Sequence, residues 1–599
     1  MGNVTINHEG NAVVMPWDQA TGAQVKQQLN IPTERMLTMT GPDGRTQVVS
    51  DTQRVALPDG VFMSDVPRFE YGGEDEVQLS MQTCSSLRER MPQLTEVIDF
   101  CAQPFRVKMQ MPDTQHIVDI QISEDDYRKL LTHLLQDPGV EQHAFLCCGI
   151  CRTESHTRLL VRDVVYADSE DFVEQSGSRL ELNPTYVLGI NDRCLAEGLH
   201  AVQVHSHPGV TSPVRFSRTD NLCESQTFPW YEEKYHDHLF PATLVFGQGD
   251  GNIDGHWWDQ DSHTVRAVDC LRVVGDHLTI HPITSAKHTP VTPVDHERFD
   301  RQERAFGYEG QLRIASLHVG IVGLGGLGAH IAQQLAHLGV SHFVLVDHDS
   351  VESTNLNRLV GARPGDIGHS KVSVMADMVR ALHSSAEIVE VIEGVETIAA
   401  REALKQCDLL IAGTDADGAR LVTNEIAVRY LIPYIDLGTG LNVADGQIRD
   451  AGGQLWFVRP GGFCLHCTGA IDPARARIDL MDPLERARHE ERYGTTSAQP
   501  SVIHLNAVIA SIAVGQVIKF ATGWRKPVEM VFYDAVKEQV TPILGPTRKD
   551  DCLVCSRTRI YARGDESDTT AFESEIPLAE LSLVTEPARH HHVSSDVKS

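Results

Sequence analysis

The chain has 599 residues, a formal net charge of −30 at pH 7 and 13 cysteines. This length favours several domains, at roughly one per 150 residues. The negative charge argues against a nucleic-acid partner, because such binding depends on neutralising phosphates. The chain begins without a signal sequence, and no uninterrupted apolar run reaches the roughly 18 to 20 residues that span a bilayer. We therefore expect a cytoplasmic protein that does not enter membranes, with its cysteines reduced or bound to metal.

Residues 1–73 form short runs of alternating apolar and polar residues, one helical stretch at 21–29, and glycine-proline turns. The segment ends in Tyr71-Gly72-Gly73. This order resembles a ubiquitin-like β-grasp domain, which implies a narrow glycine end that can enter an adenylation or protease site. The alternative is that the glycines simply begin a linker, which we assign to residues 74–104.

Residues 105–283 contain a helix that begins after Ser123 and a buried strand that begins at His143. Further on, His205 and His207 lie two apart in an extended stretch, so both rings point to one side. With Asp220 as a third ligand, two imidazoles and a carboxylate leave one open position on zinc, as a hydrolytic site requires.

These residues resemble the motif of the JAB/MPN (JAMM) metalloproteases, a family of zinc isopeptidases. The matching positions are Glu141, His205, His207, Pro208, Ser217 and Asp220. The resemblance implies that the two histidines and Asp220 bind a catalytic zinc ion. The loop between Pro208 and Ser217 is longer than usual in this family.

The same resemblance implies that Glu141 takes a proton from the attacking water and that Ser217 donates a hydrogen bond to the developing oxyanion. Glu154 is a second acidic candidate for the base. The competing interpretation of the motif is a pair of surface histidines, with Ser217 serving only as a helix N-cap.

A linker at residues 284–295 leads to a third segment, 296–562, in which an apolar run ends in a glycine turn. Its glycines are Gly323, Gly325, Gly326 and Gly328. A helical segment and a second apolar strand follow, and this strand delivers Asp347. A strand, a glycine turn, a helix and an acidic residue bind a nucleotide, with the phosphates at the helix N-terminus and the ribose at the carboxylate.

A dinucleotide dehydrogenase would share that unit, but the residues that follow favour ATP. Asp349, Asn355 and Arg358 come just after the second strand, and Lys371 follows them. A further apolar strand then ends at Asp415. Cationic and amide groups that converge with a carboxylate suit a triphosphate and its Mg²⁺.

The whole stretch resembles the ubiquitin-activating superfamily, which includes the ThiF-type adenylyltransferases and implies a Rossmann-like fold. By this resemblance Asn355, Arg358 and Lys371 bind phosphates, and Asp415 holds Mg²⁺. Arg301 would reach the triphosphate of a neighbouring subunit, which implies a homodimer. The family usually has Asn after the metal-binding aspartate; here Ala416 stands there, so the contacts at this point are weaker or involve Asp417 instead.

Two Cys-x-x-Cys pairs lie in this segment: Cys464 with Cys467, and Cys552 with Cys555. Four thiolates make a closed structural zinc site, and a redox pair is the competing interpretation. Residues 468–551 contain no cysteine, so we expect the chemistry to stop at an acyl-adenylate unless a thiol from elsewhere attacks it. Residues 563–599 are acidic and rich in Ser and Thr, and we expect them to be disordered.

Together these features predict an α/β multidomain enzyme of a bacterial ubiquitin-like pathway. It would adenylate the C-terminal glycine of a ubiquitin-like protein with ATP and hydrolyse bonds after that glycine, including its own Gly73-Glu74 bond. Partners would be a Gly-Gly-ended protein, its own N-terminal domain or a separate chain, and a conjugating enzyme or other thiol acceptor. The alternatives are activation and trimming of a sulfur-carrier protein, and a non-catalytic scaffold.

Overall fold

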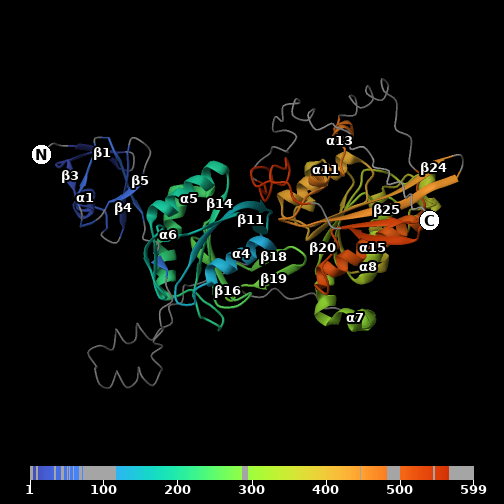
Figure 1. Cartoon of the computed structure of the whole chain (residues 1–599), viewed down its shortest axis with the longest axis horizontal. Coiled ribbons are helices and arrows are strands. Elements are labelled where there is room, and N and C mark those ends of the chain that lie inside the picture. Colours follow the sequence, from blue (N-terminus) through green and yellow to red (C-terminus); the bar gives the residue numbers. More distant parts are fainter. Residues whose placement is uncertain are drawn as a thin grey trace, which may run out of the picture.

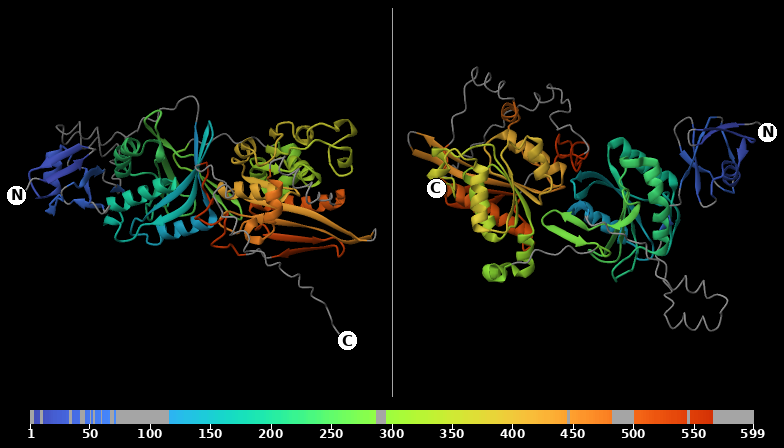
Figure 2. Two further views of the ribbon diagram at one scale, coloured as in Figure 1. Left: turned by 90° about the horizontal axis from the view of Figure 1, so that it is seen from above. Right: turned by 180° about the vertical axis from the view of Figure 1, so that it is seen from behind.

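The computed structural model consists of three units arranged along one axis, with the N-terminal unit at one end (Figure 1). The same order is seen in both views of Figure 2, where the middle unit separates the other two. The structure describes residues 4–8, 11–32, 35–41, 46–49, 51–52, 54–58, 60–66, 70–71, 116–286, 295–444, 447–481, 500–543 and 547–565. The linker predicted at 74–104 lies outside these residues.

The N-terminal unit is a mixed five-stranded sheet with one helix, in the strand order β2-β1-β7-β4-β5. Its central pair, β1 and β7, is parallel, and its other pairs are antiparallel. The helix is stabilised at its start by Thr21, which forms a capping box with Gln24. The elements are β1 (Val4–His8), β2 (Asn11–Met15), β3 (Gln19–Ala20), α1 (Gly22–Leu29), β4 (Met36–Thr40), β5 (Thr46–Val49), β6 (Val55–Ala56) and β7 (Phe62–Val66).

The middle unit is a nine-stranded mixed sheet in the order β17-β16-β15-β14-β10-β11-β9-β18-β19. The larger elements of its first half are β9 (Ile117–Ser123), α4 (Glu124–Leu135), β10 (His143–Arg152), β11 (His156–Tyr166), β12 (Phe172–Gln175), β13 (Leu180–Leu182), α5 (Pro184–Glu197) and β14 (His200–Ser206). Its second half consists of α6 (Arg218–Tyr235), the 3-10 turn η2 (His236–His238), β15 (Ala242–Phe246), β16 (Ile253–Asp259), β17 (Thr264–Ala267), β18 (Cys270–Val274) and β19 (Leu278–Pro282).

Strand β10 shows how the helices cover this sheet. Leu146 and Ile150 pack into the same buried cluster as α4, whereas Phe145 and Cys147 pack with α5 and α6. Because successive strand residues point to opposite faces, a strand covered on both sides is apolar throughout, which explains the uninterrupted run that begins at His143. The predicted cap of α4 is confirmed, since the Ser123 hydroxyl accepts a hydrogen bond from Asp126 N.

The third unit is an eight-stranded sheet in the order β22-β21-β20-β23-β24-β25-β26-β27. Its first five strands are parallel, and β25 to β27 continue the sheet in antiparallel fashion. The elements of its first half are α7 (His296–Ala315), β20 (His318–Val322), α8 (Gly326–Leu338), β21 (His342–Val346), η3 (Ser353–Asn355), η4 (Pro364–Asp366), α9 (Lys371–Leu382), β22 (Glu387–Val391), α10 (Ile398–Leu404) and β23 (Leu409–Ala412).

The second half of this unit consists of α11 (Asp417–Arg429), β24 (Tyr434–Ala444), β25 (Gln447–Val458), α12 (Leu465–Thr468), α13 (Pro473–Asp479), α15 (Ile503–Thr522), β26 (Met530–Asp534) and β27 (Gln539–Ile543). Helices α8, α9 and α15 cover one face of the sheet, and α10 and α11 cover the other. This arrangement is a Rossmann-like doubly wound sheet.

Helix α15 is mostly apolar, with polar residues such as Asn506, Gln516 and Lys519 within it. By length and composition it is apolar enough to cross a membrane, and it is the one such helix among the described residues. Half of the apolar window is buried, and residues such as Ile509 and Phe520 pack into the core beside α8 and the sheet. A core helix meets the same length and composition test, so α15 is weak evidence for a membrane contact.

A segment of the third unit, residues 552–565, which we call the strap, lies against the middle unit. A β-bridge joins Gly564 to Ile150, and Asp565 N donates to Ile150 O at 2.6 Å. The Arg557 guanidinium donates to both carboxylate oxygens of Asp126 at 2.6 Å. The predicted start of the disordered tail, at residue 563, is therefore too early, because residues 563–565 are held in this junction. Residues 566–599 lie outside the described part of the chain.

Candidate functional site

Three buried side chains of the middle unit converge at the end of β14. His205 lies on the strand, His207 directly follows it, and Asp220 lies in the first turn of α6. His205 Nε2 is 3.4 Å from Asp220 Oδ1, and His207 Nε2 is 3.2 Å from Asp220 Oδ2. In a tetrahedral zinc site, two ligand atoms each about 2.05 Å from the metal lie about 3.3 Å apart. The three side chains therefore fit one zinc ion.

The charges of this cluster support the same conclusion. Burial disfavours a charged His207 ring, but the hydrogen bond and charge of Asp220, together with the charge of Glu141, outweigh it and raise the pKa of His207. Burial likewise disfavours the Asp220 carboxylate, yet the two histidines hold its pKa well below the usual range. A buried site that attracts positive charge in this way suits a divalent cation.

Glu141 is fully buried and lies just before β10. In the antiparallel pairing of β10 with β14, His143 is opposite His205, and Ser206 N donates to Gln142 O. Extending this register by two residues, just beyond both strands, would place Glu141 opposite His207. Glu154 is exposed beyond the other end of β10, so the geometry favours Glu141 over Glu154 as the base.

Ser217 is the N-cap of α6, as the competing interpretation of the motif required. Its hydroxyl accepts a hydrogen bond from Asp220 N at 3.1 Å, and its own N–H donates to Asp220 Oδ2 at 2.6 Å. This reciprocal capping box fixes the carboxylate between the two histidine rings. In this structure Ser217 thus positions a ligand side chain, and the sequence pattern alone did not indicate this role.

The segment that ends the N-terminal unit forms a strand in the middle unit. Strand β8 (Glu70–Tyr71) pairs antiparallel with β13, with Tyr71 opposite Leu180, and the sheet order is β12-β13-β8. Strand β12 also pairs antiparallel with β13, with Gln175 opposite Leu180. The chain therefore runs in the same direction in β8 as in β12. Gly72 and Gly73 lie outside the described residues.

Two hydrogen bonds join the end of β12 to Glu141. The Gln175 side chain donates to Glu141 O at 2.8 Å, and Glu141 N donates to Ser176 O at 2.9 Å. Tyr71 and Gln175 flank β13 at the same level, two strand spacings or about 10 Å apart. The direction of β8 is thus toward the end of this small sheet at which β12 contacts Glu141.

In the third unit, the glycine turn joins β20 to α8, and two of its glycines are required by the structure. Gly323 has φ +83°, a conformation that L-residues rarely adopt. A Cβ on Gly328 would lie 2.0 Å from Gly323 O, so this position has no space for a side chain. Gly325 is the N-cap of α8, and no side chain caps the helix there. The first N–H groups of α8 are thus available to an anion.

The acidic residue after β21 holds this turn in place. Asp347 accepts a hydrogen bond from Leu324 N at 2.6 Å through one oxygen, and from Asp349 N at 2.8 Å through the other. Each carboxylate oxygen has a second lone pair, which can accept a ribose hydroxyl. Lys371 Nζ donates to Asp349 Oδ2 at 2.7 Å, which links the start of α9 to the same edge of the sheet.

Arg358 lies beside the glycine turn. A Cβ built on Gly326 would be 3.6 Å from Arg358 Cδ and 2.2 Å from Asn506 Nδ2. Asn506 was not identified from the sequence; it is a buried polar residue of α15 that accepts a hydrogen bond from Thr439. An asparagine in a mostly apolar helix was the available signal. Asn355 caps η3, where its side-chain oxygen accepts from Glu352 N at 3.1 Å.

Asp415 lies in the loop after β23, and its side chain is exposed. This loop contacts the glycine turn, since a Cβ on Gly323 would lie 3.2 Å from Thr414 N. Asp417 is instead engaged by Arg420, which donates to its Oδ1 at 2.9 Å. Asp415 is therefore the more available carboxylate of the two. Arg301 is exposed on α7, and its predicted contact with a second subunit stays a prediction.

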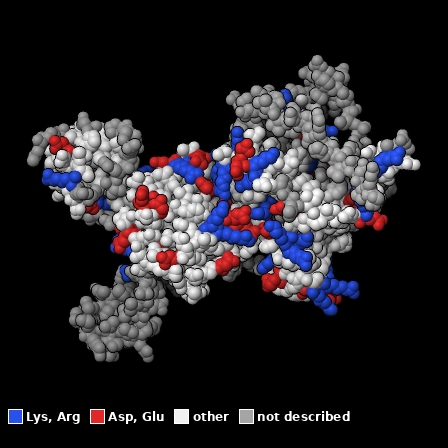
Figure 3. Space-filling view, in the orientation of Figure 1, with Lys and Arg blue, Asp and Glu red and all other residues white. Residues whose placement is uncertain are grey.

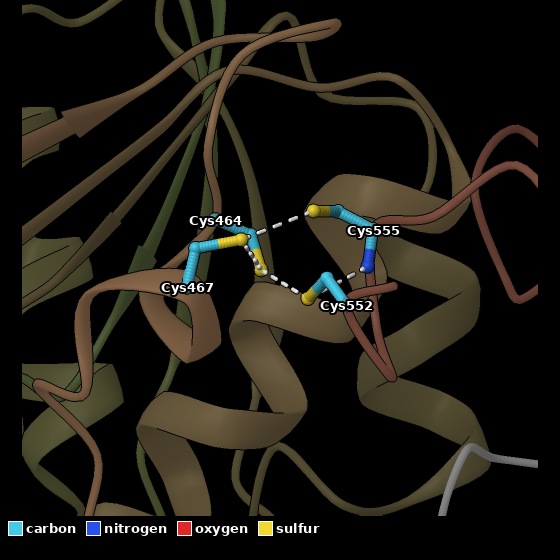
Figure 4. Close-up of side chains that lie close together, drawn as sticks. All are labelled: Cys464, Cys467, Cys552 and Cys555. Atoms are coloured by element: carbon cyan, nitrogen blue, oxygen red, sulfur yellow. Dashed lines mark hydrogen bonds between the residues drawn. The ribbon is translucent and has the colours of Figure 1, made fainter. Parts of the chain in front are cut away.

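The four cysteines of the two pairs are buried and meet at one point (Figure 4). Their Sγ atoms lie 3.9 Å apart for Cys464 and Cys467, 3.6 Å for Cys464 and Cys552, and 3.5 Å for Cys467 and Cys555. Thiolates bound to one zinc ion at about 2.3 Å lie about 3.8 Å apart. The cluster thus fits a closed structural zinc site, and it ties the strap to the start of α12.

Comparisons with known proteins agree with the Rossmann-like unit. Residues 299–554 match the family model described as ThiF family. The maize protein "Adenylyltransferase and sulfurtransferase MOCS3-1" is 26% identical over 292 residues, which are 47% of this chain and 58% of that protein. The "SAMP-activating enzyme E1" of Haloferax volcanii is 32% identical over 179 residues, which are 29% of this chain and 63% of that protein.

Among solved structures, E. coli MccB with ATP is 21% identical and has a TM-score of 0.35, with 43% of this chain and 74% of that chain covered. The chain spans less than two thirds of the length of the two curated relatives. On the match to the family model, residues 299–554 form a domain of the ThiF family.

Proposed function

We propose that the protein is a bifunctional enzyme of a ubiquitin-like pathway. Its ThiF-family domain adenylates the C-terminal glycine of a ubiquitin-like protein, and its middle unit hydrolyses bonds after that glycine. The observation that carries the proposal is the course of β8, which directs the chain before Gly72-Gly73 toward Glu141 and the cluster of His205, His207 and Asp220. A zinc-binding cluster and an adenylation domain thus act on the same kind of chain end.

The adenylation step is supported by the arrangement around the glycine turn. The first N–H groups of α8, with Arg358 and Lys371, provide positive charge for the phosphates of ATP, and Asp347 lies where a ribose hydroxyl would bind. Exposed Asp415 would hold Mg²⁺ near the α-phosphate. The carboxylate oxygen of the terminal glycine attacks the α-phosphorus, which forms the acyl-adenylate and releases pyrophosphate. The names of the two curated relatives, an adenylyltransferase and an activating enzyme, support this chemistry.

Exchange of labelled pyrophosphate into ATP tests the adenylation step. Exchange should require a protein that ends in Gly-Gly, and Asp415→Ala should abolish it. Glu402→Ala, at an exposed position of α10, is a matched control and should leave exchange unchanged. Exchange that is independent of any Gly-Gly protein would contradict the proposal and favour the scaffold alternative.

The hydrolytic step is supported by the middle unit's own residues. His205, His207 and Asp220 would hold zinc, which supplies Lewis-acid activation of water and of the scissile carbonyl. Glu141, across from His207, is positioned to take the proton of the attacking water and to pass it to the leaving nitrogen. Ser217 keeps Asp220 in place through the capping box. These are the tasks of a zinc isopeptidase.

The substrate of this step is proposed to be the protein's own N-terminal unit, among others. Its mixed sheet with a parallel central pair supports the resemblance to a β-grasp domain. Strand β8 is added to the edge of β13. Addition of a strand to a sheet edge is a common mode of binding an extended peptide, in which backbone hydrogen bonds provide the affinity. Hydrolysis of the Gly73-Glu74 bond would release a modifier with a Gly-Gly end.

The intact mass of the purified protein tests self-processing. Wild type incubated with zinc should yield two fragments, with the cut after Gly73, whereas His207→Ala should stay at full length. His238→Ala, an exposed histidine of η2, is the matched control and should be cut like wild type. If wild type stays intact while a separate Gly-Gly fusion is cut, self-processing is wrong and the hydrolase proposal stands.

The second candidate function is activation and trimming of a sulfur-carrier protein. It is favoured by the name of the maize relative, which describes a sulfurtransferase as well as an adenylyltransferase. The two functions differ in what attacks the acyl-adenylate: a persulfide in this case, and a conjugating enzyme or other thiol acceptor in the first. Attack by a persulfide releases AMP and gives an acyl disulfide, which a second thiol reduces to a thiocarboxylate, whereas attack by a thiol gives a thioester. Identification of the product by mass spectrometry decides between them.

A further inference from the structure

A basic cavity of about 330 Å³ lies where the strap meets the middle unit. Figure 3 shows basic and acidic side chains gathered where the middle and third units meet. The lining residues come from β11, from α5 and from the strap: Arg162, Asp163, Arg193, Glu197, Arg557, Thr558 and Arg563. Four guanidinium groups thus face two carboxylates.

Two of the four arginines are neutralised by neighbouring carboxylates. Arg193 donates to Asp163 at 2.8 Å and to Glu197 at 3.0 Å, so it uses both acidic groups of the lining. Arg557 donates to Asp126, outside the lining, at 2.6 Å. The carboxylates near the cavity are therefore already engaged by these two arginines.

The other two arginines bind backbone carbonyl groups. Arg162, with 3% of its surface exposed, donates to Tyr561 O and Arg557 O. Arg563 donates to Glu197 O at 2.6 Å. Within the described residues, neither forms an ion pair with a carboxylate. Burial, together with repulsion from Arg563 and Arg557, lowers the pKa of Arg162 to about 10, although the nearby charges of Glu197 and Asp163 oppose this shift.

A positive charge that is buried without a counterion is costly, and a bound anion removes that cost. The planar guanidinium group binds phosphate oxygens in a bidentate manner, which makes clustered arginines suited to phosphorylated ligands. The cavity volume is at the lower end of the roughly 300 to 1,000 Å³ of small-molecule sites. The size and charge of the cavity thus agree with a small polyanion.

We propose that this cavity binds a small phosphorylated anion of the pyrophosphate or nucleotide class. Arg563 contributes from the strap, and Arg193 contributes from the middle unit through Nη1, since its Nε and Nη2 donate to Glu197 and Asp163. The buried charge of Arg162 adds to the attraction. The ligand would bridge the middle unit and the ThiF-family domain, so its binding would stabilise their junction. The cavity is separate from the glycine turn, and this proposal does not depend on the adenylation or hydrolysis proposed above.

Calorimetric titration of the full chain with inorganic pyrophosphate tests the proposal. The titrated protein carries Arg358→Ala as a background substitution, which weakens pyrophosphate binding at the glycine turn. In this background we expect one pyrophosphate per chain, and a second change, Arg563→Gln, should weaken it about tenfold or more. Arg559→Gln, at an exposed position of the same strap, is the matched control and should leave binding unchanged.

Folding of each variant is checked by its thermal midpoint, and Arg563→Lys, which keeps the charge, should retain most of the affinity. If Arg563→Gln does not fold, Arg193→Gln tests the cavity from the other side. Tighter binding of ADP than of pyrophosphate would assign a nucleotide, and the reverse would assign pyrophosphate. Absence of binding in the Arg358→Ala background, or binding that survives both glutamine variants, would overturn the proposal.

Discussion

The contact between β10 and the strap can be tested by a single added methyl group, in Gly149→Ala. A Cβ at this position would lie 2.2 Å from Ala562 O and 2.5 Å from Arg563 O. Both obstacles are backbone atoms, so a side-chain rotation cannot relieve the overlap. A carbon and an oxygen normally stay about 3.2 Å or more apart, so the strap must move by about 1 Å.

The expected cost follows from the hydrogen bonds that this movement disturbs. They are the bond from Asp565 N to Ile150 O, the bond from Arg563 to Glu197 O, and the bond from Arg162 to Tyr561 O. At a net value of about 1 kcal/mol each, their loss destabilises the junction by about 3 kcal/mol. Overpacking of a buried site by itself typically costs about 1 to 3 kcal/mol, which agrees with this value.

Urea unfolding monitored by circular dichroism measures the effect as a lower midpoint for the transition of the middle and third units. Gly189→Ala is the matched control, because a Cβ there meets nothing within 4 Å and the residue lies in α5. It should raise the stability by about 0.5 to 1 kcal/mol, since alanine is the better helix former. If Gly149→Ala unfolds at the same urea concentration as wild type or at a higher one, the strap contact is not as described.

Three further outcomes are expected. Cys555→Ser should lower the zinc content from two ions per chain to one and reduce the thermal midpoint, and an unchanged content would refute the structural site. Glu141→Gln should slow cleavage about 10²- to 10⁴-fold with zinc retained, whereas exposed Glu154→Gln should cleave normally; equal effects would remove Glu141 as the base. Gly328→Ala should abolish pyrophosphate exchange, because its Cβ would lie 2.0 Å from Gly323 O; retained exchange would show that the turn is not required.

Local patterns in the sequence predicted several elements correctly. The strand, glycine turn and helix around Gly323 occur as expected, as does the cap of α4 at Ser123. Such features depend on residues that are close in the chain, because periodicity and capping act over one or two turns. The four cysteines were also correctly predicted to form one cluster, since their two short spacings imply a shared metal.

Contacts between distant residues could not be predicted in this way. Asn506 lies against Gly326 across 180 residues of chain, and a single asparagine has no periodicity that indicates its partner. Ser217 caps α6, as the competing interpretation expected, but the sequence did not show that its capping partner Asp220 lies between His205 and His207. The boundary expected at 563 was wrong because the strap is held by residues of another unit.

The sequence by itself identified residue types and spacings that suit metal and phosphate binding, because such patterns are recognisable locally. Tertiary structure decided which of these groups face one another. It alone revealed that β8 joins the sheet of β12 and β13, whose strand β12 contacts Glu141, and that arginines of two units meet at one cavity. Strand pairing and charge clustering depend on the relative position of whole units, which is determined by packing across the interface rather than by local sequence.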